Sequence, residues 1–311
     1  MKQTTNSILM IRPVAFRMNE QTAVNNYYQK VLDGLLPATV NAKAQDEFDT
    51  FVEKLRSVGV DVTVVEDTLE PDTPDSIFPN NWISFHQNAE VVLYPMFAEN
   101  RRAERREDIL DTLEEKGFQI KSINDYTEAE EDGYFLEGTG SLLLDRKNQK
   151  AYCALSPRAD EELFIEFCED YDLAPVIFEA FQTVEGDRKL IYHTNVIMTL
   201  GETFAVICAD CIDDKKERKM VLDNLKEDGK EVVLITEDQV NNFAGNMLEV
   251  KGADDKRYLV MSNSAYQSLT KKQITQLEKH AEILYSSLDT IEACGGGSAR
   301  CMMAEIFLPK E

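Results

Sequence analysis

The chain contains 311 residues, and its 57 acidic side chains outnumber 33 lysines and arginines, giving a formal net charge of −24. This charge argues against nucleic acid as a partner, while 43% hydrophobic and 29% charged residues indicate a globular protein with a sizeable core. No apolar run approaches the roughly 20 residues of a membrane helix, and the first residues lack the apolar region of a signal peptide. We therefore expect a cytoplasmic protein with no membrane partner, whose six cysteines are mostly free thiols.

A helix, a glycine stop and a strand form a succession that recurs along the chain. Apolar residues between Ala44 and Val58 fall on one face at helical spacing, Gly59 follows them, and residues 60–67 are typical of a strand. The same succession is predicted three more times, over residues 102–123, 159–180 and 213–236.

A fifth copy begins near the C-terminal end of the chain. Thr270 and Gln273 have the spacing of a capping box at the start of a helix. Apolar residues continue the helical pattern to position 284, and the strand of this copy is expected around Thr290 and Ile291.

Between these helical units lie five polar turns, each followed by a short β-type run. The marker residues that begin these runs are separated by 56, 56, 53 and 55 positions and are Asn81, Glu137, His193, Asn246 and Cys301. A repeat of this length with strands and one helix is typical of a propeller blade. We predict an α/β fold, a five-bladed pseudo-symmetric propeller forming one domain over residues 1–311. Equivalent positions of such a ring converge, so the five markers are expected to line one central site.

Three of the markers carry reactive groups. Cys301 supplies a nucleophile, His193 its base and Glu137 a carboxylate that orients the base. The glycines at 295–297 let backbone approach a ligand closely, and Arg300 is positioned in the sequence to lower the pKa of the neighbouring thiol. The alternatives are a locally bonded histidine, an inert buried cysteine and a solvated carboxylate; the common register favours the triad.

These segments resemble the guanidino-group-modifying superfamily, the penteins, which includes arginine deiminases, dimethylarginine hydrolases, arginine amidinotransferases and succinylarginine dihydrolases. The resemblance spans nearly the whole chain and rests on the order and spacing of five motifs: Pro74–Trp82, Leu136–Gly140, His193–Asn195, Gly245–Asn246 and the glycine-rich run ending at Cys301. It implies a propeller of five ββαβ units. It also implies that Cys301 is the covalent nucleophile, His193 the general acid and base, and Glu137 its orienting partner.

The resemblance further implies which residues bind the substrate. Family positions that hold the guanidinium match Asp75, Asn81 and Asn195, and the marker Asn246 is expected in the same pocket. Deiminases have aspartate where this chain has Asn81 and Asn195. Burying a guanidinium without fixed carboxylates is costly, whereas an amide suits a ureido group, which has one C=O and several N–H groups.

The pocket is therefore predicted to accept a neutral group. Within the superfamily the chain most resembles the citrulline ureidase branch, which implies citrulline as the substrate of a C–N hydrolase. The expected products are ornithine, ammonia and carbon dioxide, formed without a cofactor or metal. Arginines that bind the substrate carboxylate match Arg158 and either Arg101 or Arg102. The alternative to substrate binding is that the arginines between residues 101 and 106 form a solvated helix face.

Several other interpretations stay open at this stage. The superfamily also offers arginine deiminase, dimethylarginine hydrolase and amidinotransferase chemistry, or an N-acylated substrate. A non-catalytic propeller that binds ribosomal subunits is disfavoured by the net charge, and a papain-like hydrolase by the order of His193 before Cys301. Cys208 and Cys211 lack a second pair for a zinc site and are interpreted as buried structural thiols. The sequence leaves open whether the chain forms a homo-oligomer.

Overall fold

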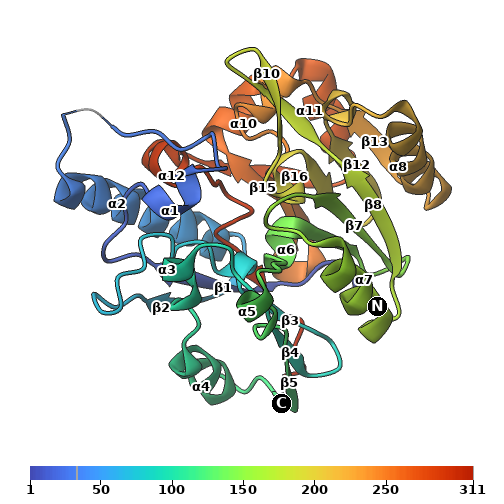
Figure 1. Ribbon diagram of the computed structural model, residues 1–311. Coiled ribbons are helices and arrows are strands. Elements are labelled where there is room, and N and C mark those ends of the chain that lie inside the picture. Colours follow the sequence, from blue (N-terminus) through green and yellow to red (C-terminus); the bar gives the residue numbers. More distant parts are fainter. Residues whose placement is uncertain (33, 311) are drawn as a thin grey trace.

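The computed structural model describes residues 1–32 and 34–310 (Figure 1). Its strands form five three-stranded sheets and one two-stranded hairpin within those residues. In every three-stranded sheet the central strand pairs antiparallel with one neighbour and parallel with the other. The predicted α/β class is confirmed, and the ββαβ succession implied by the family resemblance is the local topology of these sheets.

Four of the sheets are continuous in sequence. Their strands are β3 (Ile83–Phe85), β4 (Glu90–Leu93) and β5 (Ser122–Asp125); β6 (Leu142–Asp145), β7 (Lys150–Leu155) and β8 (Ala174–Glu179); β11 (Met198–Leu200), β12 (Phe204–Ile207) and β13 (Glu231–Leu234); and β14 (Leu248–Lys251), β15 (Arg257–Ser262) and β16 (Glu282–Ser286). The fifth sheet joins the two ends of the chain, with β17 (Ala304–Glu305), β1 (Ser7–Arg12) and β2 (Asp61–Glu66). The hairpin consists of β9 (Phe181–Val184) and β10 (Asp187–Leu190).

A helix connects the two parallel strands of each sheet. These helices are α2 (Pro37–Ser57), α4 (Glu107–Glu115), α7 (Glu161–Asp170), α8 (Lys215–Glu227) and α11 (Lys271–Leu277). Figure 1 shows α2, α4 and α8 at the periphery, with strands toward the middle. The remaining helices are short: α1 (Glu20–Ala23), α3 (Glu99–Arg102), α5 (Ala129–Asp132), α6 (Gly138–Ser141), α9 (Glu237–Val240), α10 (Asn263–Ser268) and α12 (Asp289–Gly295). No helix in the described ranges is long and apolar enough to cross a membrane.

Helix α2 illustrates how the repeat forms. Its apolar stripe, which includes Phe48, Phe51 and Leu55, is fully buried and packs in the same cluster as Val62 of β2. Gly59 follows the helix with φ of 87°, and a Cβ there would lie 2.5 Å from the backbone nitrogen of Ala253. Both the positive φ and the close approach require glycine at this stop.

The fifth copy differs from the prediction. The capping box of Thr270 and Gln273 is present at the start of α11, but the strand that follows is β16, and Thr290 and Ile291 lie in helix α12. The β-branched pair was a misleading signal because a distant carboxylate caps this helix. Glu47 of α2 accepts hydrogen bonds from the backbone nitrogens of Thr290 and Ile291, at 2.8 and 3.1 Å.

Each marker residue lies in a short turn that precedes the first strand of a sheet. Asn81 ends the 3₁₀ turn η1 (Pro79–Asn81), and His193 is the N-cap of η2 (Thr194–Val196). Glu137 precedes helix α6 in the same way, while Asn246 and Cys301 lie in turns before β14 and β17. The five side chains thus come from the segments before five first strands, but from different places in them: Glu137 and His193 are N-caps, whereas Asn81 is the last residue of its turn.

Candidate active site

Glu137 and His193 form a buried hydrogen-bonded pair. Glu137 Oε2 lies 2.7 Å from His193 Nε2, and neither side chain is more than 2% exposed. The other carboxylate oxygen, Oε1, accepts a hydrogen bond of 3.0 Å from the backbone nitrogen of Phe97. Arg158 Nη1 approaches Oε2 at 3.5 Å. Both oxygens of Glu137 are therefore fixed, and the imidazole is held by one of them.

The protonation of this pair follows from its surroundings. Burial opposes ionisation of Glu137, but the charge of Arg158 and the hydrogen bond from His193 outweigh it and lower the pKa of Glu137 to about 2. Burial lowers the pKa of His193 to about 4, although Glu137 opposes that change. At neutral pH the carboxylate is ionised and the imidazole is neutral. The carboxylate then fixes the proton on Nε2 and leaves the lone pair of Nδ1 to act as a base.

The sulfur of Cys301 is surrounded by amide groups. Asn246 Nδ2 lies 3.2 Å from Cys301 Sγ, and Asn195 Nδ2 lies 3.6 Å from it. Asn246 is itself fixed, because its Oδ1 accepts from the Arg300 backbone nitrogen at 3.0 Å and its Nδ2 donates to the Asn195 carbonyl at 3.0 Å. Cys301, Asn195 and Asn246 are each at most 3% exposed. The nucleophile is thus placed beside N–H donors that can meet developing negative charge.

Glycines in the segment 136–140 allow these groups to converge. A Cβ at Gly140 would lie 2.5 Å from Asn81 Nδ2 and 2.8 Å from His193 Nδ1. A Cβ at Gly138, whose φ is 44°, would lie 2.5 Å from the carbonyl oxygen of Asn80. A side chain at either position would displace the residues that form the site.

Arg101 occupies the position next to Asn81. Its Nη1 donates to Asn81 Oδ1 at 2.6 Å, and its Nε and Nη2 donate to the two oxygens of Glu104 at 2.8 and 2.9 Å. Arg101 and Glu104 are both buried. Glu104 was not among the residues predicted from the sequence. The signal that could have found it is its i, i+3 spacing from Arg101, which brings the two side chains together across the turn that ends helix α3.

Asp75 is a cavity-lining carboxylate with a free acceptor. Its Oδ2 accepts from Asn19 Nδ2 at 2.8 Å and from Thr22 Oγ1 at 3.0 Å, whereas its buried Oδ1 has no hydrogen-bond partner among the described residues. Burial raises the pKa of Asp75, and the nearby Arg101 opposes the increase. Asp75 therefore retains one oxygen with which to accept a hydrogen bond from a ligand.

A segment around helix α1 covers the site, and the sequence analysis missed it. Arg158 donates to the Thr22 carbonyl at 2.9 Å and to Asn25 Oδ1 at 2.9 Å, and Asn26 Nδ2 donates to the Gly295 carbonyl at 3.2 Å. The signal available was the Asn-rich composition of residues 19–26, which is typical of a loop that hydrogen-bonds backbone. This covering segment contributes Thr22 and Asn26 to the lining of the pocket that also contains His193 and Cys301.

The enclosed cavity is small. Its volume of about 10 Å³ is close to what one water needs and far below the roughly 300 Å³ or more of a typical ligand pocket. Its lining combines the covering segment with the predicted residues: Thr22, Asn26, Asp75, Phe78, Asn81, Arg101, Arg158, Tyr192, His193, Gly295, Gly297 and Cys301. The cavity must therefore widen to admit an amino acid.

The family model described as N,N dimethylarginine dimethylhydrolase, eukaryotic, matches residues 12–308. The chain belongs to this family. It is accordingly a pentein of the guanidino-group-modifying superfamily, in a family of cysteine-dependent hydrolases that cleave C–N bonds. The superfamily and the hydrolase class predicted from the sequence are thereby confirmed. No curated protein matches the chain in sequence.

Solved structures share the fold of this dimethylarginine hydrolase family member. Apo ArgZ, an arginine dihydrolase from the ornithine-ammonia cycle in cyanobacteria, has a TM-score of 0.74 at 16% identity, over 98% of this chain and 41% of that one. The chain thus spans about two fifths of ArgZ. The product-bound N-terminal domain of ArgZ gives 0.69 at 18%, covering 97% and 99%. A dimethylarginine dimethylaminohydrolase adduct with S-methyl-L-thiocitrulline gives 0.61 at 14%, covering 97% and 100%.

The structure brings all nine predicted site residues of this pentein into one buried cluster. Arg101 rather than Arg102 lines the cavity, because Arg102 Nε donates to the Met96 carbonyl at 3.0 Å and pairs with Glu130 at 3.4 Å. Arg300 differs from its expected role beside the thiol. Its guanidinium donates to the Met303 carbonyl at 2.8 Å and pairs with Glu305 at 3.0 Å. Only its backbone nitrogen supports the site.

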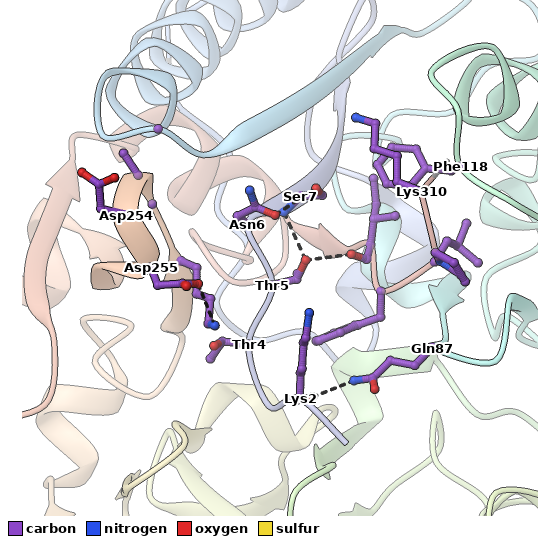
Figure 2. Close-up of a pocket in the computed structure, with 18 residues that line it drawn as sticks. Lys2, Thr4, Thr5, Asn6, Ser7, Gln87, Phe118, Asp254, Asp255 and Lys310 are labelled. Atoms are coloured by element: carbon purple, nitrogen blue, oxygen red, sulfur yellow. Dashed lines mark hydrogen bonds and ion pairs between the residues drawn. The ribbon is translucent and has the colours of Figure 1, made fainter.

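A much larger cavity lies apart from the triad. It has a volume of about 710 Å³ and is bordered by segments from both ends of the chain (Figure 2). Its polar groups include the Lys251–Asp255 ion pair at 2.9 Å. Among the described residues that line it, none is a cysteine or a histidine. Size alone therefore does not identify the reactive centre of this molecule.

Proposed function

We propose that this enzyme hydrolyses citrulline to ornithine, ammonia and carbon dioxide through a covalent intermediate on Cys301. The observation that carries the proposal is the contact between Arg101 and Asn81. A deiminase, by the resemblance drawn above, has a carboxylate at position 81 to hold a guanidinium. Here the position is a neutral amide whose oxygen is 2.6 Å from the Arg101 guanidinium. A cationic substrate group beside Asn81 would meet a like charge, whereas a neutral ureido group would not.

The groups around the sulfur support the same choice. The amides of Asn195 and Asn246 lie at 3.6 and 3.2 Å from Cys301 Sγ and offer N–H donors. A ureido oxygen can accept from such donors, whereas a guanidinium has only donors to present. The free oxygen of Asp75 accepts from a ureido N–H. Arg158 is proposed to bind the α-carboxylate of the substrate. Its guanidinium would then give up its hydrogen bonds to Asn25 and the Thr22 carbonyl and donate to the carboxylate instead.

The first step joins Cys301 to the substrate, and His193, whose pKa burial lowers to about 4, is the base. As Cys301 Sγ bonds to the ureido carbon, the thiol proton passes to His193 Nδ1 and the C=O π electrons move to oxygen, where Asn195 and Asn246 donors stabilise the charge. The imidazolium, held by Glu137, then gives its proton to the departing nitrogen as the C–N bond breaks. Ornithine leaves, and a carbamoyl thioester remains on Cys301.

Hydrolysis of the thioester completes the cycle. His193 removes a proton from water, the hydroxide adds to the carbamoyl carbon, and the C–S bond breaks to restore the thiol. The released carbamate decomposes to ammonia and carbon dioxide. The balance is one citrulline and one water consumed for each ornithine, ammonia and carbon dioxide formed, with no cofactor or metal in any step.

The wider arrangement belongs to the same proposal. We infer that the five ββαβ units form the blades of one propeller domain over residues 1–311, working in the cytoplasm on a small amino acid. Two features support the propeller arrangement. The five three-stranded sheets have the same topology, and the pairing of β17 with β1 joins the two ends of the chain.

The test is a product assay with purified protein given citrulline or arginine in parallel. Ornithine and ammonia from citrulline alone are expected, with the C301A variant as the blank. Ornithine released by C301A at the wild-type rate would remove the covalent step. Citrulline accumulating from arginine would show that the pocket accepts a guanidinium and would overturn the argument from Asn81.

A second candidate function is arginine dihydrolysis, which passes through the same thiol chemistry twice. The observation in its favour is the unpartnered Oδ1 of Asp75, which can accept from a guanidinium. The product ratio separates the two candidates, because arginine would yield two ammonia molecules per ornithine and citrulline would yield one. Ornithine from both substrates would therefore move the assignment to the dihydrolase.

A further inference from the structure

A second charged cluster lies outside the proposed active site. Arg146 and Arg300 are 5% and 4% exposed and line a cavity of about 30 Å³ together with Gln3, Thr199 and Glu305. Arg146 also borders a separate cavity of about 240 Å³. Neither guanidinium takes part in the chemistry described above. The cavity shares no lining residue with the one that contains Cys301.

The charges of this cluster do not balance. Arg300 Nη2 pairs with Glu305 at 3.0 Å, but no carboxylate in residues 1–32 and 34–310 lies within ion-pair distance of Arg146. The Arg146 guanidinium lies over the Phe307 ring, 4.2 Å from its centroid. Its Nη1 is 3.5 Å from His86 Nδ1. Two buried cations therefore share one carboxylate.

The neighbouring polar groups do not supply the missing charge. His86 Nε2 hydrogen-bonds Ser84 Oγ at 2.8 Å, and burial followed by the charge of Arg146 lowers the pKa of His86 well below its usual value. Asp145, next to Arg146 in sequence, is paired with Lys230 at 2.9 Å. Since an unpaired buried charge is strongly unfavourable, an anion from outside the chain would stabilise the cluster.

We propose that a small monovalent inorganic anion, chloride in solution, binds in this cavity between Arg146 and Arg300. The volume suits one such ion, since a single water needs about 10–15 Å³, and it excludes an organic anion. The site would also support the nucleophile. Arg300 N donates to Asn246 Oδ1 at 3.0 Å, and Asn246 Nδ2 contacts Cys301 Sγ at 3.2 Å, so an anion that fixes Arg300 steadies this chain of contacts.

The test compares chloride with gluconate, which is too large for the cavity, at equal ionic strength. Thermal unfolding of the wild-type protein is expected to shift upward with chloride and to saturate, with no matching shift in gluconate. Crystals soaked in sodium bromide should show anomalous scattering between the two guanidinium groups. Coincident unfolding curves in the two salts, or a cavity without bromide, would overturn the proposal.

Variants make the test specific. R146Q should lose the chloride-dependent shift while gaining stability in gluconate, because the uncompensated charge is gone. E305Q removes the carboxylate that competes with the anion for Arg300, so it should lower the chloride concentration at half-saturation several-fold. If R146Q does not fold, the response of E305Q tests whether chloride binds at this site. R188Q, which alters an arginine in exposed ion pairs with Asp213 and Glu237, should keep the wild-type response. A chloride shift retained in R146Q would contradict the site.

Discussion

Two buried glutamates, Glu137 and Glu104, are each paired with an arginine, yet their pKa values move in opposite directions. The pKa of Glu137 is lowered to about 2, although burial opposes this, because Arg158 and His193 stabilise its charge. The pKa of Glu104 is raised to about 7, because burial, with help from Asp75 and Asp67, outweighs its pairing with Arg101. Two equally buried carboxyl groups can therefore have very different pKa values. The number and sign of the neighbouring charges decide the direction in which each pKa shifts.

The strongest test of this difference is E137Q. The amide keeps the shape but loses the charge that fixes the His193 tautomer and stabilises the imidazolium. We expect kcat to fall by about 10³–10⁴-fold, as when the orienting carboxylate of a catalytic triad is replaced, with intact folding by circular dichroism. Retention of more than a tenth of the wild-type kcat would show that Glu137 does not act through His193.

A substitution at Gly140 tests whether catalysis tolerates a displacement of His193, the partner of Glu137. The added Cβ of G140A would lie 2.8 Å from His193 Nδ1 and 2.5 Å from Asn81 Nδ2, so the imidazole must shift. We expect a loss of about 10²-fold in kcat, the scale of a small misplacement, and a destabilisation of about 1–3 kcal/mol. Steady-state kinetics and thermal unfolding measure the two effects.

G133A is the matched control for G140A. Gly133 has φ of 79°, and a Cβ added there would meet no atom within 4 Å, so the substitution strains only the backbone. It should cost about 1 kcal/mol of stability and leave kcat unchanged. If the two variants lose kcat equally, the contact with His193 is not the cause.

The Glu104 side should respond less. E104Q removes the carboxylate that holds the Arg101 side chain through two hydrogen bonds, so the Arg101 guanidinium is fixed less firmly against Asn81. We expect a loss of about tenfold in kcat/KM for citrulline, on the order of 1.4 kcal/mol, carried mainly by KM because Glu104 contacts no reacting atom. A larger loss in kcat than in E137Q would reverse the roles assigned to the two glutamates.

The repeat explains why so much of this site could be predicted from the sequence. The near-regular spacing of the five markers was enough to bring Glu137, His193 and Cys301 together, because each lies a few residues before the first strand of a sheet. The residues that were missed lie outside the register. Glu104 and the covering segment with Asn25 follow no repeat and are fixed only by tertiary contacts.

The strand predicted at Thr290 was wrong for a related physical reason. Local β-branching favoured extended structure, but the hydrogen bonds from that backbone go to Glu47, a residue 243 positions away. Such long-range caps leave no local signal. Arg101 is the intermediate case: its residue type and position were predicted, whereas its pairing with Glu104 required the fold.

The pH dependence of the free energy of unfolding compares the two glutamates most directly, although the expected effect is the smallest. Because the folded pKa of Glu137 is depressed to about 2, its contribution is present above its unfolded pKa near about 4.3 and is lost as pH falls toward 2. Because the folded pKa of Glu104 is raised to about 7, the folded state binds the extra proton, and stability declines as pH rises from about 4.3 to 7.

Chemical denaturation of wild type, E137Q and E104Q from pH 3 to pH 8 separates these contributions. E137Q should flatten the acidic limb, and E104Q should flatten the decline between pH 5 and pH 7, each by an amount on the order of 1 kcal/mol. Removing either carboxyl flattens a slope, but the two slopes have opposite signs. If E104Q instead flattened the acidic limb, Glu104 would be an ordinary ionised partner of Arg101. The pKa values of the two glutamates would then shift in the same direction, and only their positions in the site would differ.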